Sequence, residues 1–160
     1  MQKQPEDCSC KRCQSACQSK PGWFMPGEAE KAAALLGLTL EEFFKTKLGV
    51  DWFEGDPDIF ALAPALVGRP TGHEYPGNPR GACVLFVDGR CSIHAAKPLE
   101  CREYLHGDDR ATLAERKVRI RDAWGALAPQ KQIEQLLGRE PESEEYTGGL
   151  LAGLGFPFLN

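Results

Sequence analysis

The pattern of apolar and polar residues predicts two short helices in the first third of the chain. Residues 28–36 and 40–47 carry alanine, leucine and phenylalanine at helical spacing, with acidic residues in their first turns. Gly37 ends the first of these segments, and Thr39 is suited to cap the second. We expect the two helices to form a helical hairpin that serves as scaffold.

A β-hairpin is predicted in the middle of the chain, after a long stretch with little regular pattern. Residues 51–81 are rich in proline, glycine and aspartate, and we expect an irregular connection with at most one short strand or helix inside. An apolar run then leads into Asp88-Gly89, a pair typical of tight hairpin turns. This is the one hairpin that the pattern predicts.

The register of this hairpin depends on the length of its turn. With a two-residue turn, Val87 pairs with Arg90, Cys83 lies across from His94, and Cys91 points to the other face. A three-residue loop with a bulge would bring Cys83 and Cys91 onto one face. The sequence leaves both registers open.

The last third of the chain predicts two more helices and a tail. The first helix is expected over about 110–127, with an imperfect apolar stripe and a basic, solvated remaining surface, and the second over 129–137. The chain therefore predicts an α+β fold, mainly helical: a small irregular domain with one β-hairpin and a Cys-rich metal site. Residues 1–138 would form this domain, and residues 139–160 an acidic spacer and a Gly/Leu-rich tail packing on it.

Composition and charge exclude several classes of partner. The chain is 42% hydrophobic and 26% charged, with a net charge of −4, which gives no general attraction to nucleic acid or to anionic membranes. No apolar run approaches the roughly 20 residues that span a bilayer, and the first residues lack a secretory signal. We expect a cytoplasmic protein with no nucleic-acid or membrane partner; the sequence does not define a protein partner.

Seven cysteines make metal binding the leading hypothesis. An odd number fits disulfide pairing badly, and cytosolic thiols stay reduced. Cys10-x2-Cys13 has the spacing with which two sulfurs of one loop bind a single tetrahedral ion, and Cys8 and Cys17 flank it. Zinc and iron–sulfur sites both use this spacing, so it leaves the metal open.

A second group of cysteines surrounds the predicted hairpin. Pro98 suits the first turn of a helix, which places Cys101 near a helix N-terminus and predicts a lowered thiol pKa. His94 is the candidate nitrogen ligand, although a hydrogen-bonded histidine at a strand end is the alternative reading. We expect a metal ion to bridge the two groups. The candidate ligands are Cys8, Cys10, Cys13, Cys17, Cys83, Cys91, Cys101 and His94.

Over residues 8–105 the chain resembles the YkgJ-like family of cysteine-cluster proteins, a zinc- or iron-chelating domain family. The shared motifs include Gly81-Ala82-Cys83, Gly89-Arg90-Cys91-Ser92-Ile93 and Lys97-Pro98-Leu99-Glu100-Cys101-Arg102. The N-terminal motif departs from the family pattern Cys-x2-Cys-x2-Cys-Cys, because Ala16 stands at its third cysteine and Cys8 is additional.

The resemblance implies that the protein binds zinc or iron, including iron in an iron–sulfur cluster. Some relatives are associated with methylation of flagellin lysines, which would imply S-adenosylmethionine and an iron–sulfur centre. No glycine-rich nucleotide loop on a strand–helix unit is found here, so that activity is not carried over. An iron–sulfur enzyme of the flagellin lysine N-methylase type and a metal carrier or sensor stand as alternatives to a largely structural metal site.

Overall fold

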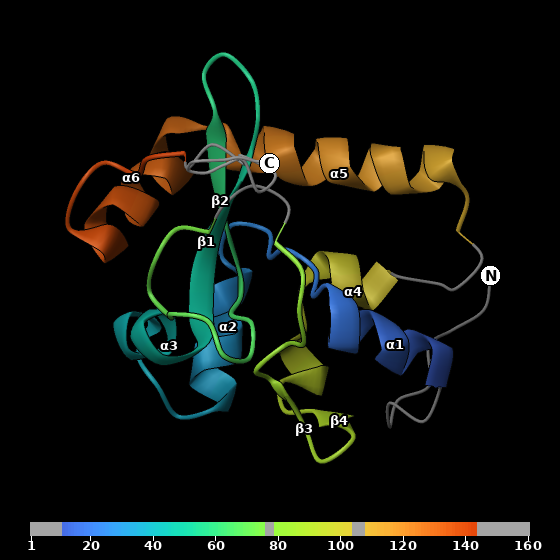
Figure 1. The fold of residues 1–160 in the computed structure, drawn as a ribbon. Coiled ribbons are helices and arrows are strands. Elements are labelled where there is room, and N and C mark those ends of the chain that lie inside the picture. The colour runs from blue at the N-terminus through green and yellow to red at the C-terminus, as the bar shows by residue number, and fades with distance from the viewer. Residues whose placement is uncertain (1–10, 76–78, 104–107, 144–160) are drawn as a thin grey trace, which may run out of the picture.

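The computed structural model describes residues 11–75, 79–103 and 108–143, apart from the side chains of Arg12 and Cys13. The fold is α+β and mainly helical, as the sequence predicts (Figure 1). In chain order its elements are α1 (Lys11–Ser19), α2 (Glu28–Leu35), α3 (Leu40–Lys47), β1 (Leu48–Phe53), β2 (Ile59–Pro64), β3 (Phe86–Val87), β4 (Arg90–Cys91), the 3-10 helix η1 (His94–Ala96), α4 (Leu99–Glu103), α5 (Arg110–Trp124) and α6 (Leu127–Leu137).

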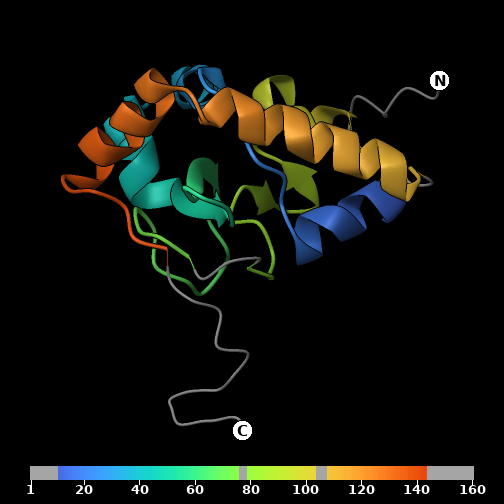
Figure 2. The same cartoon turned by 90° about the horizontal axis from the view of Figure 1, so that it is seen from above.

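An antiparallel hairpin of β1 and β2 stands at the centre of the molecule. Its register runs from Leu48 opposite Pro64 to Phe53 opposite Ile59. Helices α5 and α6 contact β2 at one end of the hairpin, and α3 packs beside β1 near the other. Figure 2 shows α5 running across the molecule from the α6 side to the α1 side.

The one short strand expected within residues 51–81 is β2, whereas β1 and its pairing with β2 are not predicted by the sequence. Most residues of β1 and β2 are buried on both faces, including Val50 and Leu62. Strands buried on both faces lack the alternation of apolar and polar residues by which a half-exposed strand is recognised. The short hairpin of β3 and β4 is therefore the second sheet of the fold.

The helical hairpin of α2 and α3 is confirmed within one residue at each end. Gly37 adopts a left-handed conformation, with φ of 72°, just after α2. Thr39 and Glu42 form a capping box at the start of α3, in which each side chain accepts a hydrogen bond from the other residue's backbone. Local sequence signals are therefore enough to predict where the two helices of this hairpin begin and end.

One apolar core joins the N-terminal segment, the central hairpin and the late helices. Phe24, Phe43, Phe44, Leu62 and Trp124 are all almost completely buried in it. Trp124 Nε1 donates a buried hydrogen bond of 2.6 Å to the carbonyl of Phe24. The two residues are 100 positions apart in the chain, so this bond ties α5 to the segment that follows α1.

The late helices differ from the prediction in length and in exposure. α5 ends at Trp124 and α6 begins at Leu127, so the break falls within the range expected for one helix. Arg116, expected on a solvated basic surface, is only 4% exposed. None of the helices that the structure describes has both the length and the apolar character needed to cross a bilayer.

After α6 the chain returns to the loop beside β1. Both terminal nitrogens of Arg139 donate to the Glu74 carboxylate at 2.6 Å, and the Glu142 N–H donates to it at 3.0 Å. The beginning of the predicted acidic spacer is thus held on the domain. Residues 144–160, which include the predicted Gly/Leu-rich tail, lie outside the described part of the chain.

Candidate metal centre

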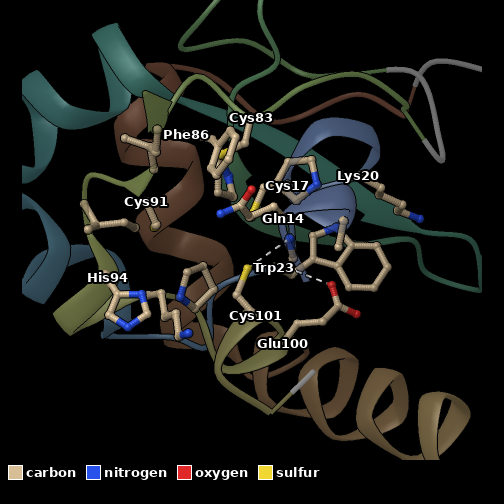
Figure 3. A pocket seen from close by; sticks show the side chains of 18 of the residues that line it. Gln14, Cys17, Lys20, Trp23, Cys83, Phe86, Cys91, His94, Glu100 and Cys101 are labelled. Carbon is tan, nitrogen blue, oxygen red and sulfur yellow. Dashed lines mark hydrogen bonds between the residues drawn. The ribbon is translucent and has the colours of Figure 1, made fainter. Parts of the chain in front are cut away.

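Four cysteines from four different segments line one cavity of about 310 Å³ (Figure 3). Cys17 comes from α1, Cys83 from the loop before β3, Cys91 from β4 and Cys101 from α4. The structure therefore places one cysteine of the N-terminal group in the same cavity as the three later ones. His94, at the start of η1, also lines this cavity.

Backbone hydrogen bonds hold the N-terminal segment against the later cysteine segments. The Cys83 N–H donates to the Cys17 carbonyl at 2.8 Å, and the Gly81 N–H donates to the Ser19 carbonyl at the same distance. On the other side of the cavity, the Gly22 N–H donates to Cys101 Sγ at 3.4 Å. The segment from α1 to Gly22 is therefore bonded to two of the later cysteine segments, which brings Cys17 close to Cys83 and Cys101.

Of the two turns that the sequence leaves open, the short hairpin has the two-residue turn. Asp88 and Gly89 both have positive φ, 51° and 75°, as a type I′ turn requires, and Val87 pairs with Arg90. Phe86 pairs with Cys91, and the ladder ends there.

The expected pairing of Cys83 with His94 is wrong, because the chain turns before the strand reaches that far. The Phe86 N–H donates to the Cys83 carbonyl, which closes a tight turn, and Cys83 instead forms a bridge with Leu66. The strict alternation of faces along a strand is lost at this turn. Cys83 and Cys91 consequently line the same cavity, although the turn has two residues.

Two thiols of this cavity, those of Cys83 and Cys101, are weak acids. Burial, together with neighbouring Cys17 and Cys91, raises the pKa of Cys83 to about 12, against hydrogen bonds from the Leu85 and Phe86 N–H groups. Burial also raises the pKa of the Cys101 thiol well above its usual range, which outweighs the hydrogen bond from Gly22. The predicted lowering at Cys101 is therefore wrong: α4 is short, and desolvation dominates. These thiols ionise at neutral pH only when a cation compensates their charge.

The remaining candidate ligands are not all described. Cys8 and Cys10, and the side chain of Cys13, lie outside the described part of the chain. Within the described residues, no three side chains of histidine, cysteine, aspartate or glutamate are arranged to hold a single metal ion. The four described cysteines line one cavity without forming a compact site for one ion.

The rest of the wall carries residues that the sequence did not single out. Trp23 packs against the cavity, and its indole N–H donates to the buried Asp51 carboxylate at 2.7 Å. Glu100 accepts a hydrogen bond of 3.1 Å from the Trp23 N–H. Lys20, Arg116 and Lys117 also line the cavity. Lys20 and Glu100 lie close to cysteines in sequence, which is a usable signal, but nothing local marks the two residues of α5.

Comparisons of the chain with protein-family models, with curated proteins and with solved structures found no match. The site is therefore interpreted from its own residues and geometry.

Proposed function

We propose that the protein binds a metal centre through cysteine thiolates at this cavity, and that the metal joins α1 to the β3–β4 hairpin and α4. The observation that carries the proposal is that Cys17, Cys83, Cys91 and Cys101 line the same cavity. Thiolate sulfur is the ligand that zinc and iron–sulfur clusters share. The metal would hold together segments that are far apart in the chain.

The free-energy cost of ionising buried thiols supports this proposal. Burying several ionised sulfurs side by side is unfavourable unless a cation neutralises them. A metal ion supplies that charge, and in structural zinc sites binding contributes on the order of 10 kcal/mol to folding. Such a contribution exceeds the net stability of many small domains.

Two kinds of metal centre fit a cavity that four cysteines line. Within the described residues no three candidate side chains are arranged to hold one ion, yet four cysteines face the same space. An iron–sulfur cluster is bound by four cysteines around a larger body than one zinc ion. Zinc is the second candidate, with Cys8, Cys10 or Cys13 completing its ligands.

Elemental analysis and a visible spectrum of protein purified without oxygen test the proposal. An iron–sulfur centre predicts a brown protein whose visible absorbance is lost in air, and zinc predicts a colourless protein with stoichiometric zinc. Replacing Cys17, Cys83, Cys91 or Cys101 singly by serine should remove most of the bound metal. Ser15→Ala, at an exposed position of α1, is the matched control and should leave the metal content unchanged. A metal-free protein, or metal retained in all four variants, would refute the proposal.

A further inference from the structure

The cavity wall is much more positive than the protein as a whole. Among the described residues, four cationic side chains line it, those of Lys20, Lys97, Arg116 and Lys117, against one carboxylate, that of Glu100. The complete chain carries a net charge of −4. Cationic side chains are thus concentrated at this cavity in an acidic protein.

Arg116 is a buried cation with incomplete hydrogen bonding. Its side chain is only 5% exposed, and Nη2 donates to the Asp108 carboxylate at 2.8 Å and to the Glu103 carbonyl at 3.1 Å. Within the described part of the chain, Nε and Nη1 are buried without a hydrogen-bond partner, and Glu103 Oε1 lies 3.8 Å from Nε. A buried donor without an acceptor costs about 1–3 kcal/mol, and more when it is charged. An acceptor that enters the cavity would remove this cost.

Two of the cationic side chains gather at the Trp23 end of the cavity. The amino groups of Lys20 and Lys117 lie over the Trp23 ring, 5.0 and 5.3 Å from its centre. Figure 3 shows Lys20, Trp23 and Glu100 on one side of the view, and Cys91 and His94 on the other.

We propose that this end of the cavity binds a small organic anion, with a carboxylate or phosphate head near Arg116 and Lys117 and an apolar body against Trp23 and Leu113. Charge-assisted hydrogen bonds from a guanidinium or an ammonium group are the usual way in which proteins bind such heads. A cavity of about 310 Å³ is at the lower end of the range for small-molecule sites. The proposal does not depend on the metal centre, because none of these four residues is a proposed metal ligand.

Calorimetric titration of the protein as purified, with three probes that share one apolar ring, tests the anion site. Phenylacetate and phenyl phosphate carry the two heads, and phenylacetamide is the neutral counterpart of the first. We expect at least one anionic probe to bind at least about tenfold more tightly than phenylacetamide, the factor that one lost charge-assisted contact gives. The stronger of the two anions identifies the head. Equal binding of all three probes, or no binding of either anion at millimolar concentration, would overturn the proposal.

Variants of α5 locate the binding site. Arg116→Gln should weaken binding of the preferred anion by about tenfold or more, and Lys117→Gln by about three- to tenfold. Arg121→Gln removes an exposed charge of the same helix that pairs with Asp122, and should leave binding unchanged. Lys117 is exposed, so its replacement keeps the test decisive if Arg116→Gln does not fold. Unchanged binding in Lys117→Gln, or an equal loss in Arg121→Gln, would contradict the proposed site.

Discussion

The core around β1 and β2 and the wall of the cysteine cavity are stabilised in different ways. In the core, aromatic and aliphatic side chains such as Phe43 and Leu62 are fully buried, and the buried Asp51 accepts hydrogen bonds from Trp23 and Trp52. The cavity wall instead gathers thiols and cations, including the two nitrogens of Arg116 without partners. Burial of apolar groups favours folding by itself, whereas burial of these polar groups costs free energy unless a ligand compensates it.

The segment of residues 22–24, which follows α1, contacts both regions and couples them. The Phe24 N–H donates to the Leu62 carbonyl at 3.0 Å, and the Phe24 carbonyl accepts from Trp124. Two residues earlier, Gly22 contacts Cys101. The core therefore positions one wall of the cavity, and damage to the core should reach the cavity more readily than the reverse.

The largest effect is expected from Phe43→Ala in the core. Phe43 is completely buried, and deletion of a buried phenylalanine ring lowers the free energy of unfolding by about 3–5 kcal/mol. Urea unfolding should show this loss with and without a metal chelator, since the core does not use the metal. Leu35→Ala, at a half-exposed position of α2, should change stability by less than about 0.5 kcal/mol. A loss that disappears on chelation would show that core and cavity are not separate.

Gly22→Ala should disturb the contact between the two regions, where Gly22 packs against α4. A Cβ atom at Gly22 would lie 2.7 Å from Glu100 Cβ and 3.0 Å from Cys101 Sγ, so the start of α4 must move. Overpacking of this kind costs about 1–3 kcal/mol, and the displaced sulfur should lower the metal content as well.

The same substitution at another glycine controls for the general effect of adding a methyl group. A Cβ atom at Gly55 would approach only the Pro57 carbonyl, at 3.3 Å, so Gly55→Ala should cost much less and leave metal content unchanged. Thermal unfolding and elemental analysis measure both variants. Full metal content in Gly22→Ala would mean that the contact with Cys101 does not position its sulfur.

The sequence predicts those parts of the fold that depend on local signals. Gly37 and Thr39 act through their own backbone neighbourhood, so the ends of α2 and α3 follow from residue type. The Asp88-Gly89 turn is predicted for the same reason. The hairpin of β1 and β2 is not, because burial on both faces removes the alternation that marks a strand.

The candidate site likewise has residues that the sequence identifies and contacts that it does not. Cysteine is recognised by its chemistry wherever it lies, so Cys17, Cys83, Cys91 and Cys101 are found from the sequence. The pairing of Cys83 with His94 fails because it extends a strand past a turn that tertiary contacts impose. Arg116 is missed because its burial depends on how α5 packs, and the sequence of a basic helix gives no sign of which arginine faces inward.

Glu74→Gln should weaken the attachment of the segment after α6 to the loop beside β1. This segment belongs neither to the core nor to the cavity wall. Burial would raise the pKa of Glu74, but hydrogen bonds from Arg139 and the Glu142 N–H outweigh it and lower the pKa to about 2 from an ordinary value of 4.5. The lowered pKa makes the carboxylate stabilising at neutral pH. Because Arg139 is half-exposed, we expect Glu74→Gln to cost about 1–2 kcal/mol at pH 7.

The pH dependence separates this charge effect from simple packing. The stabilisation is complete above pH 4.5 and is lost as the pH falls toward 2, so the difference between wild type and Glu74→Gln should shrink over that window. Urea unfolding at a series of pH values measures it, with the exposed Glu54→Gln as control. A difference that stays constant down to pH 2 would contradict the charge effect.

Thr39→Ala tests whether loss of a helix cap lowers the stability of the core region without affecting the cavity. Thr39 Oγ1 accepts a hydrogen bond of 3.1 Å from the Glu42 N–H, and loss of such a cap costs about 1 kcal/mol. Thr46→Ala, at an exposed position of the same helix, removes no cap and should be close to neutral. Urea unfolding compares the two variants, and elemental analysis should find wild-type metal content in both, because the helical hairpin supplies no residue to the cavity wall. An equal loss of unfolding free energy in both threonine variants would mean that the capping box does not stabilise α3. Reduced metal content in Thr39→Ala would show that the cavity depends on the helical hairpin as closely as the core does.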